Sequence, residues 1–345
     1  MARETVTSED VARLANVSQS AVSRTFTPGA SVSERTRQRV LDAARQLGYR
    51  PNALARAMIS GRSRLIAVLV AYLDNHFYPQ VLEQLSRAVQ ERGYQVLLFL
   101  TDRGTQDQMV QKMLQYQVEG IVMASADMSS SLARECADTG IPVVLFNRYV
   151  TSSLSSSVTS DNVGGARMVT DLLISAGHRR IAFIAGTEDS STNQDRESGF
   201  LQAMERGGLL PFRRLVGDYT SEGAAHAARR LFESDERPDA IVVANDHMAF
   251  AVMDVIRDEA GLSIPDDVSV VGFDDVPEAG WGGYKLTTVR QAADVMIEET
   301  VKILFEQIEK GEVERRAIIV PASLSVRTSA RLPSAEKLER IIEGA

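Results

Sequence analysis

The chain has 345 residues, of which 44% are hydrophobic and 24% are charged, and its formal net charge at pH 7 is −8. This length accommodates a small module together with one large or two medium domains, and the hydrophobic share suffices for buried cores. The first residues lack the apolar core of a signal peptide, and no stretch is long enough to cross a bilayer. We therefore expect a cytoplasmic protein with no membrane partner.

The charge is unevenly distributed along the chain. Residues 1–62 hold ten Arg and five acidic residues, a net of +5, whereas the remainder carries a net of −13. A basic segment joined to an acidic body is typical of a protein that binds nucleic acid through one part. Arg suits this role because its planar guanidinium forms paired hydrogen bonds with phosphate and guanine.

Residues 7–26, TSEDVARLANVSQSAVSRTF, predict two short helices joined by a tight turn. Ser8 and the acids after it suit a helix start, and Asn16 tolerates the left-handed backbone of a turn. Ser18 can cap the second helix, whose inward side chains are Ala21, Val22 and Phe26. Its outward side chains have the size and polarity to contact base edges and phosphates: Gln19, Ser20, Ser23 and Arg24. This layout is that of a DNA-reading helix-turn-helix, and the alternative is a helical hairpin with a solvated polar face.

Two further helical segments follow. Ser33 can cap a third helix that ends at Gly48, and its core-facing side chains are Val40, Leu41, Ala44 and Leu47. Residues 51–58 begin with a proline, which suits a first helical position, and continue mostly with good helix formers. Eight residues are too few for a stable isolated helix, so we expect this hinge helix to order only against DNA or its twin in a dimer.

From Leu65 on, apolar runs alternate with helical patterns, which predicts an α/β body of parallel sheets built from strand–helix–strand units. We expect strands at 65–71, 95–100, 120–123, 143–146, 181–184, 215–217, 240–243 and 268–272, with helices near 78–89, 106–117, 129–139 and 295–308. Two doubly wound lobes result. The Ser-rich run 151–157 is predicted to be a surface loop within one lobe, and the single Cys136 a buried structural thiol.

The runs DVARLANVSQSAVSR, VSERTRQRVLDAARQLGYRPNALAR, VANDHMAFAVMDVI and SVVGFDDVPEA together resemble the lac repressor family of bacterial transcription regulators, over residues 6–331. The resemblance implies a type I periplasmic-binding-protein fold whose chain crosses between the lobes near 161, 289–291 and 321–323. It implies a headpiece at 1–50, a hinge helix and linker at 51–62, a body at 63–331 and a tail at 332–345. Lobe one would comprise 63–161 and 292–320, and lobe two 162–289 and 321–331.

The resemblance also implies how DNA is bound. In that family the recognition helix enters the major groove, and the hinge helices pair in the minor groove and wedge an apolar side chain between base pairs. Carried over, the base-reading residues are Gln19, Ser20 and Arg24, the phosphate contacts are Ser18, Ser23 and Ser33, and the minor-groove residues are Asn52, Ala55 and Met58. Met58 stands where the family usually has Leu, which makes a softer wedge, and Asn16 replaces the usual turn Gly.

Ligands of parallel sheets lie beyond the carboxyl ends of the strands, and polar and aromatic residues gather at these positions here. They suit a polyhydroxylated ligand and include Asp74, Phe77, Tyr78, Asn147, Arg148, Arg196, Tyr219, Asn245, Asp246, Asp274 and Trp281. The resemblance assigns effector contacts to Asn147, Arg196, Asn245 and Asp274, with Tyr219 and the loop around Phe77 as walls. The alternatives are that Asp274 caps a loop, Arg196 is solvated, and Trp281 packs rather than stacks.

Enzyme signatures are absent from the sequence. It contains neither a phosphate loop nor a G-x-S-x-G elbow, no G-x-G-x-x-G follows the first strand, and the four His have no metal-binding spacing, so we expect no cofactor and no metal. The expected function is a dimeric repressor of a palindromic operator, switched by a sugar-type effector whose sign stays open. Rival hypotheses are a free solute-binding protein, which requires an export signal and no basic head, and a sugar-active enzyme. The tail offers only Leu338, Ile341 and Ile342, too few for a zipper, so we expect no tail-driven tetramer.

Overall fold

The computed structural model describes residues 6–27, 29–50, 62–71, 73–101, 104–124, 128–150, 154–233 and 235–343. The chain forms two compact units, Met1–Arg64 and Leu65–Ala345. The predicted hinge helix, with Asn52, Ala55 and Met58, lies outside the described residues. Among the residues described, every helix is too short or too polar to span a bilayer.

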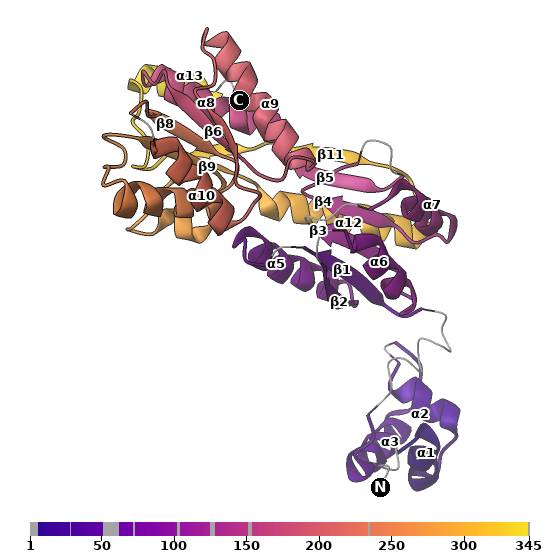
Figure 1. Cartoon of the computed structure of the whole chain (residues 1–345). Helices are drawn as coiled ribbons and strands as arrows, with labels where there is room; N and C mark the ends of the chain where they lie inside the picture. Colours follow the sequence, from indigo (N-terminus) through magenta and orange to yellow (C-terminus); the bar gives the residue numbers. More distant parts are fainter. Residues whose placement is uncertain are drawn as a thin grey trace. The chain divides into compact units, whose positions relative to one another are not determined.

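The first unit is a three-helix module of α1 (Ser8–Ala15), α2 (Gln19–Thr25) and α3 (Glu34–Leu47) (Figure 1). Helix α1 is capped one residue earlier than expected, because Thr7 and Asp10 form a reciprocal capping box instead of a cap at Ser8. Asn16 takes the left-handed conformation with φ 49°, and the Ser18 hydroxyl accepts from the Ala21 N–H. The turn that the sequence predicts is therefore present.

Small apolar side chains form the core of this module. Val11, Val22 and Val40 are at most 1% exposed and meet between the three helices. Two of the arginines counted as basic charge are also structural: Arg37 donates to the Thr25 carbonyl at 3.1 Å, and Arg39 donates to the carbonyls of Ala15 and Asn16. Helix α3 is thus tied to the ends of both preceding helices, which fixes how α2 is presented.

The second unit contains two six-stranded sheets. The first has the order β11-β5-β4-β3-β1-β2 and is parallel throughout. Its strands are β1 (Leu65–Val70), β2 (Gln95–Leu100), β3 (Gly120–Ala124), β4 (Val143–Phe146), β5 (Ser156–Ser160) and β11 (Ala317–Val320). Side chains alternate between its faces: Ile66 and Val68 pack with α5 (Phe77–Glu91) and α12 (Ala293–Lys310), whereas Ala67 and Leu69 pack with α6 (Gln106–Leu114) and α7 (Ser130–Asp138). Cys136 on α7 is fully buried, as predicted.

The second sheet has the order β12-β10-β9-β8-β6-β7, and only the β10–β12 pair is antiparallel. Its strands are β6 (Ile181–Ala185), β7 (Arg214–Val216), β8 (Ala240–Val243), β9 (Ser269–Asp274), β10 (Thr287–Arg290) and β12 (Ser323–Ser325). Its helices are α8 (Asn162–Ser175), α9 (Ser191–Arg206), α10 (Ser221–Phe232), α11 (Asp246–Asp254), which continues into a π-helical turn at Val255–Glu259, and α13 (Ala335–Glu343). Helices α8 and α9 pack closely at Gly199, where a Cβ would lie 2.2 Å from the Val163 carbonyl oxygen.

The chain passes between the two sheets at three places. It leaves β5 for α8 at Asp161, leaves β10 for α12 at 291–292, and leaves β11 for β12 at 321–322 (Figure 1). The fold class is therefore that of two doubly wound α/β lobes with a helix-turn-helix module before them.

The prediction of a surface loop at 151–157 was wrong in its second half. Ser156 and Ser157 belong to β5, an interior strand between β4 and β11, and both are buried. The Ser156 hydroxyl is satisfied there by the Glu314 carbonyl at 3.1 Å and by the Gln307 amide at 3.2 Å. A serine strand carries no apolar signal, because its burial depends on hydrogen bonds that only the folded chain supplies.

Candidate functional site

Helix α2 presents a polar face on the surface of the first unit. Its side chains Ser18, Gln19, Ser20, Ser23 and Arg24 are exposed, as is Ser33 at the start of α3. Val22 and Thr25 point the other way, into the core. The exposed side chains combine hydrogen-bond donors, acceptors and one cation, which is the chemistry of base-edge and phosphate contacts.

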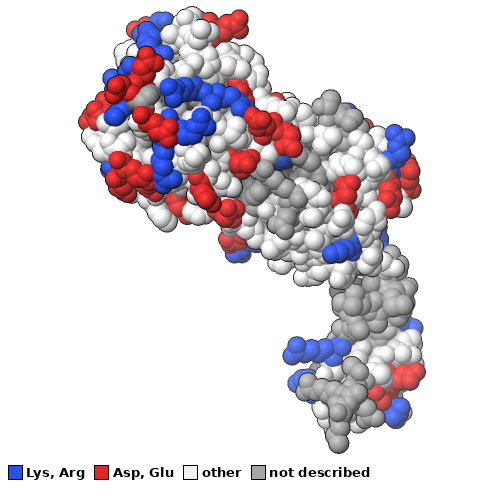
Figure 2. Space-filling model, in the orientation of Figure 1, with Lys and Arg blue, Asp and Glu red and all other residues white. Residues whose placement is uncertain are grey.

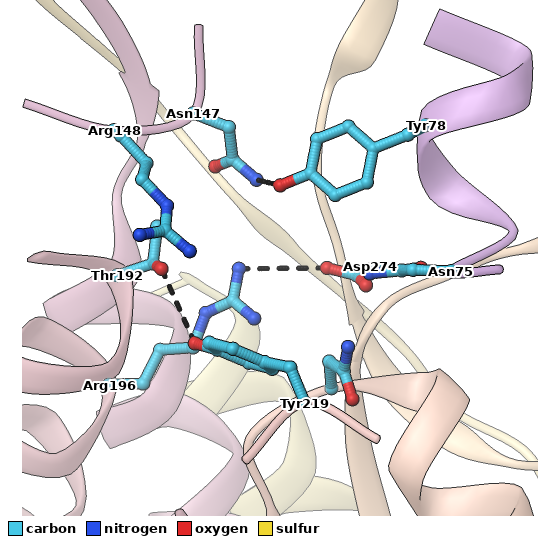
Figure 3. A pocket seen from close by; sticks show the side chains of 9 residues that line it. Asn75, Tyr78, Asn147, Arg148, Thr192, Arg196, Tyr219 and Asp274 are labelled. Atoms are coloured by element: carbon cyan, nitrogen blue, oxygen red, sulfur yellow. Dashed lines mark hydrogen bonds and ion pairs between the residues drawn. The ribbon is translucent and has the colours of Figure 1, made fainter. Parts of the chain in front are cut away.

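The second unit contains a pocket between its two lobes, with about 350 Å³ of space that includes open solvent. Nine residues line it: Asn75, Tyr78, Asn147, Arg148, Thr192, Arg196, Tyr219, Asn245 and Asp274. Figure 3 shows Tyr78, Asn147 and Arg148 from the first lobe opposite Arg196 and Tyr219 from the second.

Left-handed backbone at the strand ends turns several of these side chains inward. Asn147 follows β4 with φ 58°, Tyr219 follows β7 with φ 59°, and Asp274 ends β9 with φ 135°. Such conformations cost energy for residues with a Cβ and are concentrated at functional sites. The Tyr219 ring also needs Gly186 beneath it, since a Cβ there would lie 2.2 Å from the ring.

Arg196 holds together the residues that the second lobe contributes to the pocket. Its Nε donates to Asn162 Oδ1 at 2.8 Å, and its Nη1 donates to the Ala244 carbonyl at 2.6 Å. Its Nη2 lies 3.5 Å from Asp274 Oδ1, and the guanidinium carbon lies 3.7 Å from the centroid of the Phe273 ring. Because Arg196 is only 3% exposed, the alternative of a solvated Arg is wrong.

Two buried carboxyl groups lie at this end of the pocket. Burial raises the pKa of Asp274, while Arg196 and the Gln291 amide, which donates to Asp274 at 2.6 Å, oppose that rise. Asp246 lies behind the lining and is fully buried, and this burial together with the charge of Asp274 raises its pKa to about 8. Its oxygens contact the Thr288 hydroxyl at 2.5 Å and the Val276 N–H at 3.1 Å. Burial and the nearby Asp274 therefore favour the protonated form of Asp246, and Asp274 is the counter-charge of Arg196.

Replacing Asp246 with Asn should make the protein's thermal stability less sensitive to pH. The folded-state pKa of about 8 lies above the roughly 3.9 of an unfolded Asp, so the folded chain keeps a proton that the unfolded chain loses as pH rises. Wild-type stability therefore falls over this range, whereas an Asn side chain does not titrate; its oxygen can accept from the Val276 N–H and its NH2 can donate to the Thr288 hydroxyl. The melting temperature of the variant minus that of wild type should therefore increase as the pH is raised from about 5 to about 8. A difference that stays constant with pH would contradict this assignment.

Two buried amide atoms in the pocket wall lack a hydrogen-bond partner among the described residues: Asn147 Oδ1 and Asn245 Nδ2. The Tyr78 hydroxyl lies 3.5 Å from Asn147 Nδ2, and burial raises its pKa to about 12, so it stays neutral well above neutral pH. Unsatisfied buried polar atoms cost energy, so these groups suit a ligand that both donates and accepts hydrogen bonds, such as one bearing hydroxyls.

The structure brings together most, though not all, of the predicted pocket residues. Asn147, Arg196, Tyr219, Asn245 and Asp274 line the pocket. Phe77 lies behind this lining, against Tyr78 and Phe146. Asp74 is outside it, with its side chain 63% exposed and 3.8 Å from His247 Nε2. Trp281 is 56% exposed and does not line the pocket, so it neither packs in the core nor stacks there.

Sequence reasoning missed two lining residues. Asn75 precedes α5 and accepts from the Phe77 N–H at 3.1 Å, and Thr192 at the start of α9 lies 3.3 Å from the Tyr219 hydroxyl. Both follow strands, β1 and β6, at their carboxyl ends. The strand-end rule reached both segments, because Asp74 and Phe77 flank Asn75 and Arg196 lies on the same helix as Thr192, but it did not select these two side chains.

An exposed polar helix on a helix-turn-helix unit, followed by a two-lobed body with a polar pocket, defines a ligand-responsive DNA-binding regulator. A family model described as bacterial regulatory proteins, lacI family, matches residues 7–52, and a periplasmic binding protein-like domain matches residues 170–330. The HTH-type transcriptional regulator CelR of Thermobifida fusca is 32% identical over 337 residues, 95% of this chain and 99% of the relative. The chain belongs to the lacI family of bacterial regulatory proteins.

Solved structures agree with this membership over most of the chain. The lac repressor dimer bound to operator and the anti-inducer ONPF is 26% identical with a TM-score of 0.85, covering 94% of this chain and 99% of that chain. A CelR–cellobiose complex is 30% identical with a TM-score of 0.71, covering 94% of this chain and 100% of that one. The protein is therefore a transcription regulator with a DNA-binding unit and an effector-binding unit.

Proposed function

We propose that the protein is a cytoplasmic repressor that binds a palindromic operator as a homodimer and responds to a sugar-type effector in the interlobe pocket. The pair of unsatisfied amide atoms, Asn147 Oδ1 and Asn245 Nδ2, is the observation that carries the effector class. Together with the neutral Tyr78 hydroxyl they match the hydroxyl groups of a sugar, and the Tyr219 ring matches its apolar face. The cellobiose bound by the related regulator supports the same class.

The DNA-binding role rests on α2. Gln19, Ser20 and Arg24 would read bases, and Ser18, Ser23 and Ser33 would contact phosphates. Asn52, Ala55 and Met58 would enter the minor groove; this part of the proposal falls outside the described residues. The corresponding division of the chain is a headpiece at 1–50, a hinge and linker at 51–62, a body at 63–331 and a tail at 332–345. We propose no turnover of the bound ligand and no tetramer held by the tail.

The switch acts through the relative arrangement of the two lobes. Effector contacts reach both lobes at once, through Asn147 in the first and Asn245 in the second. A ligand that favours one arrangement shifts the first-lobe contacts of the dimer and thereby the spacing of the two hinge segments. Coupling of about 1–3 kcal/mol, or roughly 5- to 150-fold in operator affinity, is typical of such switches.

Replacing Asn245 with Ser tests the effector site without removing its structural role. Asn245 caps α11, because its Oδ1 accepts from the Met248 N–H at 3.0 Å, and Ser is an equally good cap. Only the buried Nδ2 donor is lost. The effector is first identified by calorimetry with wild type and a panel of mono- and disaccharides. Its dissociation constant should then be about tenfold higher for the variant. Folding should be unchanged, and Ser substituted for the exposed Asp74 serves as the control. Undiminished sugar affinity in the Asn245 variant would remove this residue from the site.

A further inference from the structure

A second cavity lies on the outer surface of the second lobe, away from the interlobe pocket. It is an open groove bounded by α8, the last residue of α9 and the C-terminal helix α13, with about 800 Å³ of space that includes open solvent. Met168 and Ile341 form apolar parts of its wall. Neither the DNA-binding face nor the effector pocket accounts for it.

Cations dominate the lining of this groove. Arg167 comes from α8, Arg206 from α9, and Lys337 and Arg340 from α13, whereas Asp171 is the one acidic residue that lines it. In Figure 2 Lys and Arg side chains are interspersed with Asp and Glu side chains over the surface of the second lobe, so the excess of cations is confined to the groove lining. Asp171 pairs with Arg206, and Glu336 pairs with Arg340. Arg167 and Lys337 form no ion pair with any residue that the structure describes. An anion in the groove would therefore be attracted chiefly by Arg167 and Lys337, whose charges no ion pair offsets among the described residues, with the donors of Arg206 and Arg340 nearby.

The groove is also where the tail helix meets the body. Helix α13 packs on α8 and has no buried residue, so few apolar contacts hold it in place. Two of the four cations lie on this helix and two lie on the body. An anion bound between them would bridge α13 to the second lobe.

We propose that this groove is a binding site for a small phosphate-bearing anion with more than one charge. Three of the four cations are Arg, whose planar donors pair with phosphate oxygens, and the cations approach from both walls. A compound with two phosphate groups engages both walls at once. The site is distinct from the sugar-type pocket, which lies between the lobes.

Helices α8 and α9 each extend from the interlobe pocket to the groove. Helix α8 begins at Asn162, which accepts from Arg196 Nε at 2.8 Å, and its later residues Arg167 and Asp171 line the groove. Helix α9 carries Arg196 in the pocket and ends at Arg206 in the groove. The pair is closely packed at Gly199. An anion that clamps α13 onto these helices therefore acts on the elements that position the effector-contacting Arg196.

Calorimetric titration of the full chain with inorganic pyrophosphate, at constant ionic strength, tests the site. Wild type should bind it saturably, and the double variant Arg167→Gln/Lys337→Gln should bind about tenfold or more weakly. These two side chains are chosen because neither holds an ion pair needed for folding. Arg230→Gln, which removes an exposed Arg outside the groove, should match wild type. Absence of saturable binding, or equal affinity in the double variant, would overturn the proposal.

Hydrogen exchange supplies a second readout on the same samples. Pyrophosphate should slow amide exchange in residues 335–343 of wild type and of Arg230→Gln, and not in the double variant. Binding without this protection would contradict the bridging role of α13. Because neither measurement uses operator DNA or a sugar, their failure would leave the repressor proposal standing, and failure of that proposal would leave the groove's result unchanged.

Discussion

Replacing Arg196 with Leu should lower the free energy of unfolding by about 3–5 kcal/mol and abolish the response to the effector. The guanidinium is buried and has three polar partners, Asn162, Ala244 and Asp274. Its removal leaves a buried carboxylate without its counter-charge and two hydrogen-bond acceptors unsatisfied. Urea denaturation of the full chain, followed by circular dichroism, measures the loss.

A double variant separates the charge from the packing. Adding Asp274→Asn to Arg196→Leu removes the unpaired carboxylate, so the double variant should be more stable than the Arg196 variant alone. Arg229→Leu, at an exposed ion pair with Glu259, should leave the urea midpoint near that of wild type. An Arg196 variant as stable as wild type would show that Arg196 does not hold the second lobe's side of the pocket together.

Arg24→Ala should reduce sequence preference more than general DNA affinity. A guanidinium that pairs with the two acceptors of a guanine contributes about 1–3 kcal/mol of discrimination, whereas phosphate contacts elsewhere on the headpiece are independent of sequence. Arg24 is exposed on α2, so its removal leaves the core of Val11, Val22 and Val40 intact. Titrations with an operator and with a shuffled duplex, at two salt concentrations, measure both quantities.

The matched comparison is Arg37→Ala. In wild type the Arg37 side chain donates to the Thr25 carbonyl and so holds the end of α2 against α3. That change should lower headpiece stability and weaken operator and shuffled DNA alike. If Arg24→Ala also weakened the two duplexes equally, Arg24 would be a phosphate contact and the base-reading assignment would fall.

Apolar periodicity predicted the parts of the fold that bury apolar side chains. Strands such as β1, β3 and β8 are fully apolar runs, and each was expected within one residue of its observed bounds. Strand β5, with the sequence SSVTS, was not expected, because it is polar and the buried hydroxyl of Ser156 is satisfied by hydrogen bonds from Gln307 and to Glu314. Its place in the sheet depends on a segment some 150 residues later, which local sequence cannot reveal.

The pocket followed the same pattern. The rule that ligands lie beyond strand ends identified Asn147, Arg196 and Asn245, since these positions are set by topology. Trp281 satisfied the same rule and nonetheless lies exposed after a short 3₁₀ turn at Pro277–Gly280. Side-chain direction in a loop depends on its backbone conformation, such as the left-handed φ at Tyr219, and no periodicity in the sequence encodes that.

Selection of sheared genomic DNA on the purified full chain, followed by sequencing, tests the central claim most directly. Wild type should enrich a short palindrome, and Arg24→Ala should not. A sugar identified by calorimetry should change the yield of that palindrome for wild type but not for Asn245→Ser. Failure of wild type to enrich any sequence, with or without sugars, would contradict the account of an effector-switched, operator-specific repressor.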